Sequence, residues 1–554
     1  MTSSEEIKKK QKMDPLTTAL AAMTDSTKRS LFDVTIVCTT DDYQAEYWTK
    51  RLSEGLCSST SSDSSDESPF PLVLAVSEDW AKGGAGNGLG TLYAYQKACN
   101  VAKEKHDIDL DALMMDKKVS AALYHTAGKG TRLAPLPASE NNNKPGVKLP
   151  VCHKLSDGTW APITVLEAVV KQTGVYASSR KGRLSVFWGD QVFIPSAPFE
   201  YTPTHHVDIM CTLLGQTAPT AEEWVEKGLD KYGVIAVSQG EEKNAAQVEK
   251  VDHATAVKML RELGDIGQVG PSLGSFSVSA PMLKALCDEY SSELTAKSGK
   301  FDTDPHFWMP LTLSEENYIA LMKQKDVEED VSKTHHQRMA KMKSSFSLNG
   351  MGIFGAVDVG SEACWWDYGQ LKLYIDNNMK LLDREDPNAD LLRKFMGVTS
   401  RLMDTDVDSS KLTVDDKSCA FSCKISTGSI SNSVLANVEA VDVQVEDAIV
   451  VNCTARKIYA PKGAILYNLV DDSEEGIVAA EGDVIVSVTN EDGEQTILKS
   501  KKTTCGGKAW KQVIEGNSMS FEAVHGKNMD ADVTKIEKKR MELFRKTSDS
   551  FTFQ

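Results

Sequence analysis

The sequence predicts an α/β protein with a mixed, mainly parallel sheet, followed by a C-terminal parallel β-helix. Three observations favour this fold class. Short β-branched runs alternate with helical segments as far as about residue 385, which is typical of layered α/β domains. Two of the turns that follow strands are rich in glycine. From about residue 425, apolar runs recur at intervals of 15 and 16 residues, and long helices disappear.

Length and composition indicate a multidomain protein that works in solution. A chain of 554 residues is too long for one core, so we expect two or three domains. The net charge of −17, without basic runs, argues against nucleic acid or a membrane as partner. The N-terminus has no apolar run long enough for a signal peptide, and the 11 cysteines form no CxxC pair. We therefore expect a cytoplasmic protein.

The first part of the chain predicts one α/β domain over residues 31–385. Strands are expected at 32–38, 72–76, 119–124 and 183–188, and helices at 43–52, 92–103 and 164–173. Further helices are expected at 323–345, 368–382 and 386–398. Residues 1–30 are expected to form a flexible N-terminal segment, mobile or loosely helical, and the acidic, serine-rich run 57–68 a flexible loop.

The C-terminal part predicts a repetitive β domain over residues 425–525. The runs 434–437, 449–452 and 465–468 fit successive coils of a parallel β-helix, in which each coil buries its apolar face against the next. A small antiparallel barrel is the alternative. Residues 386–424 are expected to be a helical linker, and 526–554 a charged C-terminal helix. Because only His525 occurs in 425–525, we expect this domain to serve assembly into a homo-oligomer rather than acyl transfer.

A glycine-rich turn follows the predicted strand 119–124. It reads Thr126-Ala127-Gly128-Lys129-Gly130-Thr131-Arg132-Leu133. Glycines let backbone N–H groups approach a triphosphate, and the planar fork of Arg132 suits phosphate oxygens. The spacing excludes a Walker A loop, which needs Ser or Thr where Gly130 stands, and a dinucleotide fingerprint, which needs glycine at Leu133. An ordinary tight turn is the alternative.

This loop, Gly-x-Gly-Thr-Arg-Leu after a strand, resembles the signature of the sugar nucleotidylyltransferase superfamily. Three later segments are similar to further motifs of that superfamily and follow in the same order: Gly189-Asp190, Tyr232-Gly233-Val234-Ile235 with Glu249-Lys250, and Trp365-Trp366-Asp367-Tyr368-Gly369. The resemblance implies a Rossmann-like catalytic domain and a left-handed β-helix as its companion.

The order of the segments differs from that of most of the superfamily. Two strands precede the signature loop, and Gly88-Leu89-Gly90-Thr91-Leu92 resembles a glycine segment that usually comes later. This order implies a rearranged strand order in the sheet. It is similar to the order found in the fucose-1-phosphate guanylyltransferases.

The resemblance implies Mg²⁺-dependent transfer of a nucleoside monophosphate from an NTP to a sugar 1-phosphate, with release of pyrophosphate. It implies nucleotide binding by Gly88, Gly90, Thr91, Ala127, Gly128, Gly130 and Thr131, sugar binding by Gly233, Glu249 and Lys250, and Mg²⁺ binding by Asp190 and Asp367. Arg132 is expected to be catalytic. A strand-end turn residue is the alternative for Asp190, and a helix N-cap the alternative for Asp367.

The expected catalytic lysine departs from the pattern. The family places it four residues before a proline, but that position before Pro150 is Gly146. Either of the flanking residues, Lys144 or Lys148, is therefore a candidate. A catalytically inactive relative that binds a sugar nucleotide is the alternative function. Such a protein would be expected to lose Arg132 or an aspartate, whereas this chain has them.

Overall fold

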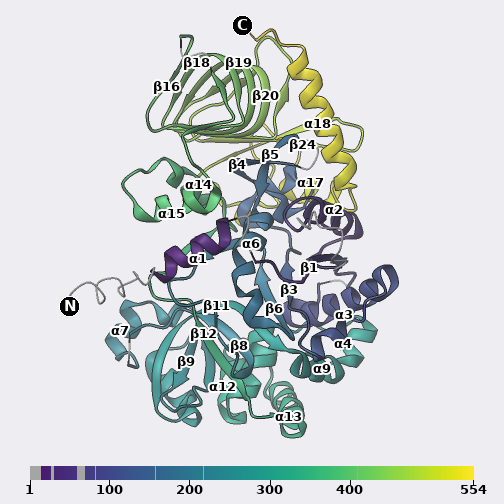
Figure 1. Ribbon diagram of the computed structural model, residues 1–554, viewed down its shortest axis with the longest axis vertical. Coiled ribbons are helices and arrows are strands. Elements are labelled where there is room, and N and C mark those ends of the chain that lie inside the picture. Colours follow the sequence, from purple (N-terminus) through teal and green to yellow (C-terminus); the bar gives the residue numbers. More distant parts are fainter. Residues whose placement is uncertain are drawn as a thin grey trace, which may run out of the picture.

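The computed structural model describes residues 14–25, 30–58, 69–80, 83–155, 158–215, 217–407 and 410–553. An α/β part and a stack of parallel strands lie next to each other, with the C-terminal helix running along the stack (Figure 1). Within the described ranges, every helix is too short or too polar to cross a lipid bilayer. Most of the predicted loop 57–68 lies outside these ranges, as do residues 1–13 and 26–29.

A nine-stranded mixed sheet forms the α/β part. Its strands are β1 (Val34–Thr39), β2 (Leu72–Ser77), β3 (Ala121–His125), β6 (Arg183–Trp188), β8 (His205–Cys211), β9 (Gly233–Ser238), β10 (Ala245–Glu249), β11 (Ile266–Ser279) and β12 (Gly352–Asp358). Strands β2, β1, β3 and β6 lie side by side and parallel, and β11 joins β6 in the antiparallel sense. The predicted α/β class with a mainly parallel sheet is confirmed.

Helices cover both faces of the parallel strands. One face packs against α2 (Asp42–Glu54) and α6 (Val165–Thr173), and the other against α3 (Gly86–His106), α4 (Leu110–Met115) and α9 (Ala280–Glu289). Alternate strand residues enter the two cores, which explains why these strands read as continuous apolar runs. Helix α2 begins where Asp41 accepts the Gln44 N–H (2.8 Å), and α6 begins with a capping box of Thr164 and Glu167.

The described part of the N-terminal segment contains a packed helix, so of the two expected forms, mobile or loosely helical, the helical one is found for residues 15–24. Residues 15–24 of the segment expected to be flexible form helix α1 (Pro15–Thr24), which buries Ala19, Leu20 and Met23. Together with Leu16, these positions follow the spacing i, i+3, i+4, i+7 of one helical face. The apolar pattern was therefore present in the sequence.

The C-terminal part is a stack of parallel strands in register. Strands β17 (Cys419–Phe421), β19 (Val434–Glu446), β20 (Ile449–Ala460) and β21 (Ile465–Tyr467) pair so that Cys419 faces Val434, Val434 faces Ile449 and Ile449 faces Ile465. Paired residues are 15 or 16 positions apart in the sequence, which is the repeat that the sequence predicted. The alternative of an antiparallel barrel is wrong for this region, and the handedness of the stack stays a prediction.

Three asparagines form a hydrogen-bonded ladder across the stack. Asn437 donates to Asn452 (2.7 Å), and Asn452 donates to Asn468 (2.6 Å). All three adopt positive φ, between 52° and 57°, a conformation that asparagine tolerates better than most residues. The ladder ends on the α/β part, where Asn468 donates to Ser139 Oγ (2.9 Å) and Glu140 Oε1 (2.8 Å).

The helix expected at 386–398 is confirmed as α15 (Pro387–Met396), but the rest of the expected helical linker 386–424 is not helical in its described residues. Short strands of the stack begin at β14 (Leu402–Met403), because parallel pairing with β17 replaces local helix formation. The stack ends in an antiparallel pair, β24 (Asp483–Thr489) with β25 (Gln495–Lys501), and helices α17 (Phe521–Lys527) and α18 (Val533–Asp549) follow. One apolar core, which includes Leu149, Val451 and Tyr467, crosses the junction between the two parts.

Candidate active site

A cleft lies at the carboxyl ends of β1, β2, β3 and β6. Thr40, Glu78, His125 and Asp190, each at or just beyond the end of one of these strands, line a cavity of about 930 Å³. Open α/β sheets bind ligands at this edge, because side chains at the ends of neighbouring parallel strands converge there. The cavity is large enough for a nucleotide and a sugar phosphate.

The glycine loop forms one wall of the cleft. Thr126 anchors the loop by donating its N–H (3.1 Å) and hydroxyl (2.7 Å) to the Cys38 carbonyl. Gly128 has φ +123°, and a Cβ there would meet nothing within 4 Å, so its backbone faces open space. Gly130 has φ +62°, and a Cβ there would lie 3.2 Å from Lys144 Cγ. Positive φ and the close approach of Lys144 both favour glycine at this position.

Two aspartates converge beside the glycine loop. Asp190 follows β6, and Asp367 ends β13 (Cys364–Asp367), which pairs antiparallel with β7 (Gln191–Ile194). The Tyr368 N–H donates to the Asp190 carbonyl (2.9 Å), which fixes the two segments together. A Cβ on Gly369 would lie 2.7 Å from Asp190 Oδ2 and 3.0 Å from Asp367 Oδ1. Both carboxylates therefore reach the same small volume.

Lys144 and Arg132 bring positive charge to these carboxylates. Lys144 Nζ lies 2.5 Å from Asp190 Oδ2. Burial raises the pKa of Asp367, the Gly369 N–H opposes this shift, and the nearby charge of Asp190 raises the pKa further. The charges of Arg132 and Lys144 act in the opposite direction and lower it. The two carboxylates thus repel each other across a gap that a cation fills favourably.

The described lining of the cleft is locally basic in a protein of net charge −17. It combines the cations Lys129, Arg132, Lys144 and Lys300 with the carboxylates Glu78, Asp190 and Asp367. This composition suits a polyphosphate that brings its own divalent cation.

Lys148, the second lysine candidate, lies elsewhere. It begins β4 (Lys148–Lys154), its side chain is 7% exposed, and its Nζ pairs with Glu140 (2.8 Å) and Glu537 (3.3 Å). It does not line the cleft. Of the two lysines, the structure places only Lys144 beside an expected metal-binding aspartate.

Three expected nucleotide-binding residues, Gly88, Gly90 and Thr91, do not line the cleft, because they are buried within helix α3. A Cβ on Gly88 would lie 2.8 Å from the Phe301 carbonyl, and one on Gly90 would lie 2.9 Å from Glu78 Oε2. These glycines thus permit close packing. The helix instead presents its first turn, Gly86 and Asn87, to the cavity.

Of the other expected nucleotide-binding residues, Ala127 and Gly128 line the cleft, whereas Gly130 and Thr131 shape the loop behind it. The expected sugar-binding residues Gly233, Glu249 and Lys250 lie on the β9–β10 hairpin and do not line the cleft. Glu249 is engaged in an ion pair with Lys325 (2.5 Å).

Several lining residues were not expected from the sequence. Glu78 follows β2 as Asp190 follows β6, so its position at a strand end was a usable signal. Its pKa is raised, first by burial, against the opposing effect of the Ala85 N–H. His525 and Met529 reach the cleft from α17 and the residues after it. The His525 carbonyl accepts a hydrogen bond from Asn142 (2.8 Å), so the C-terminal part completes one edge of the cleft.

His125, which lines the cleft, is expected to make the stability of the protein depend on pH. Burial lowers the pKa of His125 to about 4, from an ordinary 6.5, and its Nε2 lies 2.8 Å from Thr91 Oγ1. The folded protein therefore binds fewer protons than the unfolded chain between these pH values, and its stability falls as pH drops from 6.5 to 4. We expect His125→Gln to reduce this slope by up to about 1.4 kcal/mol per pH unit in denaturant unfolding. Equal slopes would contradict the buried neutral state.

Among the described residues, no group of three or more His, Cys, Asp or Glu side chains forms a closed metal site. Mg²⁺ does not need one, because it binds through one or two carboxylates together with water and substrate phosphates. Asp190 and Asp367 match that donor set, and the Lys144 ammonium already pairs with one of them.

Comparison with known proteins adds no family to this geometry. No protein-family model and no curated protein sequence matches this chain.

Proposed function

We propose that this protein transfers a nucleoside monophosphate from an NTP to a sugar 1-phosphate and releases pyrophosphate. The observation that carries the proposal is the meeting of Arg132, Lys144, Asp190 and Asp367 beside the glycine loop in one cleft. The motifs that contain them are spread from residue 126 to residue 369. If the glycine loop were an ordinary tight turn and Asp190 an ordinary strand-end residue, these four side chains would have no reason to meet in one cleft.

The reaction needs positioning and charge neutralisation more than proton transfer. The phosphate oxygen of the sugar phosphate is already an anion, and it attacks the α-phosphorus in line as pyrophosphate leaves. In this proposal the backbone at Ala127 and Gly128 holds the triphosphate, and Arg132 stabilises the pyrophosphate that leaves. Lys144 stabilises the charge on the oxygens of the α-phosphorus in the transition state.

Asp190 and Asp367 would hold the Mg²⁺ that accompanies the nucleotide. When bound, the ion supplies charge neutralisation to the phosphates. Lys144 pairs with Asp190 in the absence of ligand, and in the proposed complex its ammonium turns to the α-phosphate. The locally basic lining of the cleft supports binding of the anionic phosphates of the nucleotide.

From the resemblance to the sugar nucleotidylyltransferases we also propose that the C-terminal stack is a left-handed β-helix. The parallel register at 15 and 16 residues and the asparagine ladder support a coiled architecture.

The proposal is tested by a pyrophosphate-release assay. Each of ATP, GTP, UTP, CTP and dTTP is combined with Mg²⁺ and a panel of sugar 1-phosphates, and the NDP-sugar is identified by mass spectrometry. Release that requires both substrates is the expected result. Nucleotide binding without turnover for every pair would favour the inactive, sugar-nucleotide-binding alternative.

Arg132→Ala is expected to lower kcat/KM by about a hundredfold, because the exposed guanidinium no longer stabilises the charge on pyrophosphate. Arg261→Ala is the matched control, since Arg261 is an exposed arginine outside the cleft. Circular dichroism verifies that both variants fold. Equal activity of the two variants would remove Arg132 from the mechanism.

A further inference from the structure

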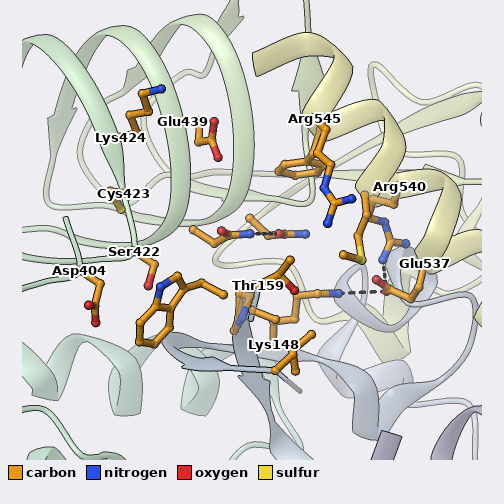
Figure 2. A pocket seen from close by; sticks show the side chains of 18 of the residues that line it. Lys148, Thr159, Asp404, Ser422, Cys423, Lys424, Glu439, Glu537, Arg540 and Arg545 are labelled. Carbon is orange, nitrogen blue, oxygen red and sulfur yellow. Dashed lines mark hydrogen bonds and ion pairs between the residues drawn. The ribbon is translucent and has the colours of Figure 1, made fainter. Parts of the chain in front are cut away.

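A second pocket lies between the two parts of the protein, away from the glycine loop. It encloses about 470 Å³, a volume typical of small-molecule sites. Its walls come from α2, the hairpin of β4 and β5 (Trp160–Thr164), the coils of the stack and helix α18 (Figure 2). We refer to it as the interdomain pocket.

The side of this pocket next to α18 is built from buried charged groups. Lys148 pairs with Glu140 and Glu537, and Arg540 pairs with Glu537 and donates to the Ser139 carbonyl (2.6 Å). Arg540 is 2% exposed, yet its Nε has no hydrogen-bond partner among the described residues. Burying charged groups costs free energy unless groups of opposite charge pair with them.

Arg545 adds a cation that is not compensated. Its side chain extends from α18 toward the pocket on the same side as Arg540 (Figure 2). Arg545 is exposed, and no hydrogen bond or ion pair of its side chain occurs within the described parts of the chain. The buried cations of the lining, by contrast, have carboxylate partners: Arg51 with Glu167, Lys148 with Glu140, and Arg540 with Glu537. An anionic group of a ligand would give Arg545 a partner of opposite charge, and phosphate matches the planar guanidinium fork.

The opposite side of the pocket offers neutral and acidic hydrogen-bonding groups. Asp404 and Ser422 lie at the far end from Arg540 (Figure 2), and Asn437 and Asn452 also line the cavity. Asn437 uses its amide N–H₂ toward Asn452, which leaves its oxygen available to accept from a ligand hydroxyl. Carboxylate, hydroxyl and amide groups in one place suit a polyhydroxylated molecule.

We propose that the interdomain pocket binds a phosphorylated, hydroxyl-bearing metabolite of sugar-phosphate size. The phosphate pairs with Arg545, and the hydroxyls meet Asp404, Ser422 and Asn437. Binding at this pocket does not depend on the reaction in the cleft.

One chain segment connects the two cavities. Glu140 and Lys148 form an ion pair beside the interdomain pocket, whereas Asn142 and Lys144, between them in sequence, line the cleft. A ligand that shifts Lys148 would therefore act on a segment only a few residues from the Lys144–Asp190 pair. Occupation of the pocket is expected to change turnover in the cleft, and this part of the inference rests on the proposed function.

Isothermal titration with glucose 6-phosphate, ribose 5-phosphate, glucose and inorganic phosphate tests the site on the full-length chain. At least one sugar phosphate is expected to bind, and more tightly than glucose or phosphate alone. Arg545→Ala is expected to weaken this binding by about tenfold or more, the size of a lost charge-assisted hydrogen bond. Lys546→Ala removes the next cation of α18, which does not line the pocket, and is expected to bind as the wild type does.

A cleft variant separates the two cavities. Asp190→Ala is expected to retain sugar-phosphate binding, whereas binding lost in Asp190→Ala but kept in Arg545→Ala would place the ligand in the cleft and overturn the proposal. Absence of binding by both sugar phosphates, or equal binding of glucose, would overturn it as well. If pyrophosphate release is observed, the sugar phosphate should alter KM or kcat in the wild type and not in Arg545→Ala. Titration without any enzymatic activity still tests the pocket.

Discussion

Asp190→Asn is expected to lower kcat by roughly a hundredfold to a thousandfold while the protein stays folded. The substitution keeps the shape of the side chain but removes the charge that faces Asp367 and pairs with Lys144. In the ligand-free protein the substitution removes the repulsion between the two carboxylates and also breaks the ion pair with Lys144, so these two effects on stability oppose each other. Mg²⁺ binding to the NTP complex is expected to weaken. Steady-state pyrophosphate release at increasing Mg²⁺ measures both effects.

Asp288→Asn provides the matched control for this experiment. Asp288 is an exposed aspartate paired with a lysine (3.0 Å to Lys284 Nζ), but it lies on α9 outside the cleft. We expect its activity to equal that of the wild type. Wild-type kcat and Mg²⁺ dependence in Asp190→Asn would show that the carboxylate takes no part in the chemistry.

Lys148→Met is expected to destabilise the fold by about 3–5 kcal/mol, whereas Lys144→Met lowers turnover with little loss of stability. Lys148 is buried against Glu140 and Glu537, so its removal leaves buried carboxylates with too little positive charge. Lys144 is more exposed, and its removal leaves Asp190 close to solvent in the cleft. Urea unfolding and pyrophosphate release, measured on both variants, separate the two roles.

The same cluster predicts how stability depends on pH. Burial acts to raise the pKa of Glu537, but the charges of Arg540 and Lys148 outweigh it and hold the pKa at about 2, below its ordinary 4.5. This group stabilises the fold at pH above 4.5 and loses its contribution as pH falls toward 2. Lys148→Met is expected to flatten this dependence. Unchanged stability in Lys148→Met with loss of activity would reverse the assignment of the two lysines.

Local patterns in the sequence predicted much of the α/β part. Strand β6 was expected at 183–188 and is found there, and β2 extends the expected 72–76 by one residue. These strands are short, mainly apolar runs that end at polar or turn-forming residues, so their signal lies within a few positions. By contrast, β8, β11 and β12 were not expected. They contain glycine, histidine or proline and gain their conformation from pairing with strands distant in the chain.

The expected site residues show the same division. Asp190 was expected from the resemblance of Gly189-Asp190 to a superfamily motif, and its position at a strand end places it at the edge where ligands bind to open α/β sheets. The role of Gly88 and Gly90 could not be inferred, since a glycine that contacts a ligand and one that packs against Phe301 or Glu78 look alike in the sequence. His525 reaches the cleft only because the C-terminal part folds back onto the segment around Asn142.

The amino-acid order was enough to specify the alternation of strands and helices, the glycine loop and the repeat near 15 residues, because propensity and apolar periodicity act over neighbouring positions. The sequence did not distinguish Lys144 from Lys148 as the candidate catalytic lysine. The assembled protein separates them: the short turn Lys144–Gly146 leaves one ammonium at Asp190, and the strand that follows carries the other into a charged cluster shared with α18. Burial and charge pairing between distant segments are properties of the folded chain, and they decide which lysine faces the cleft.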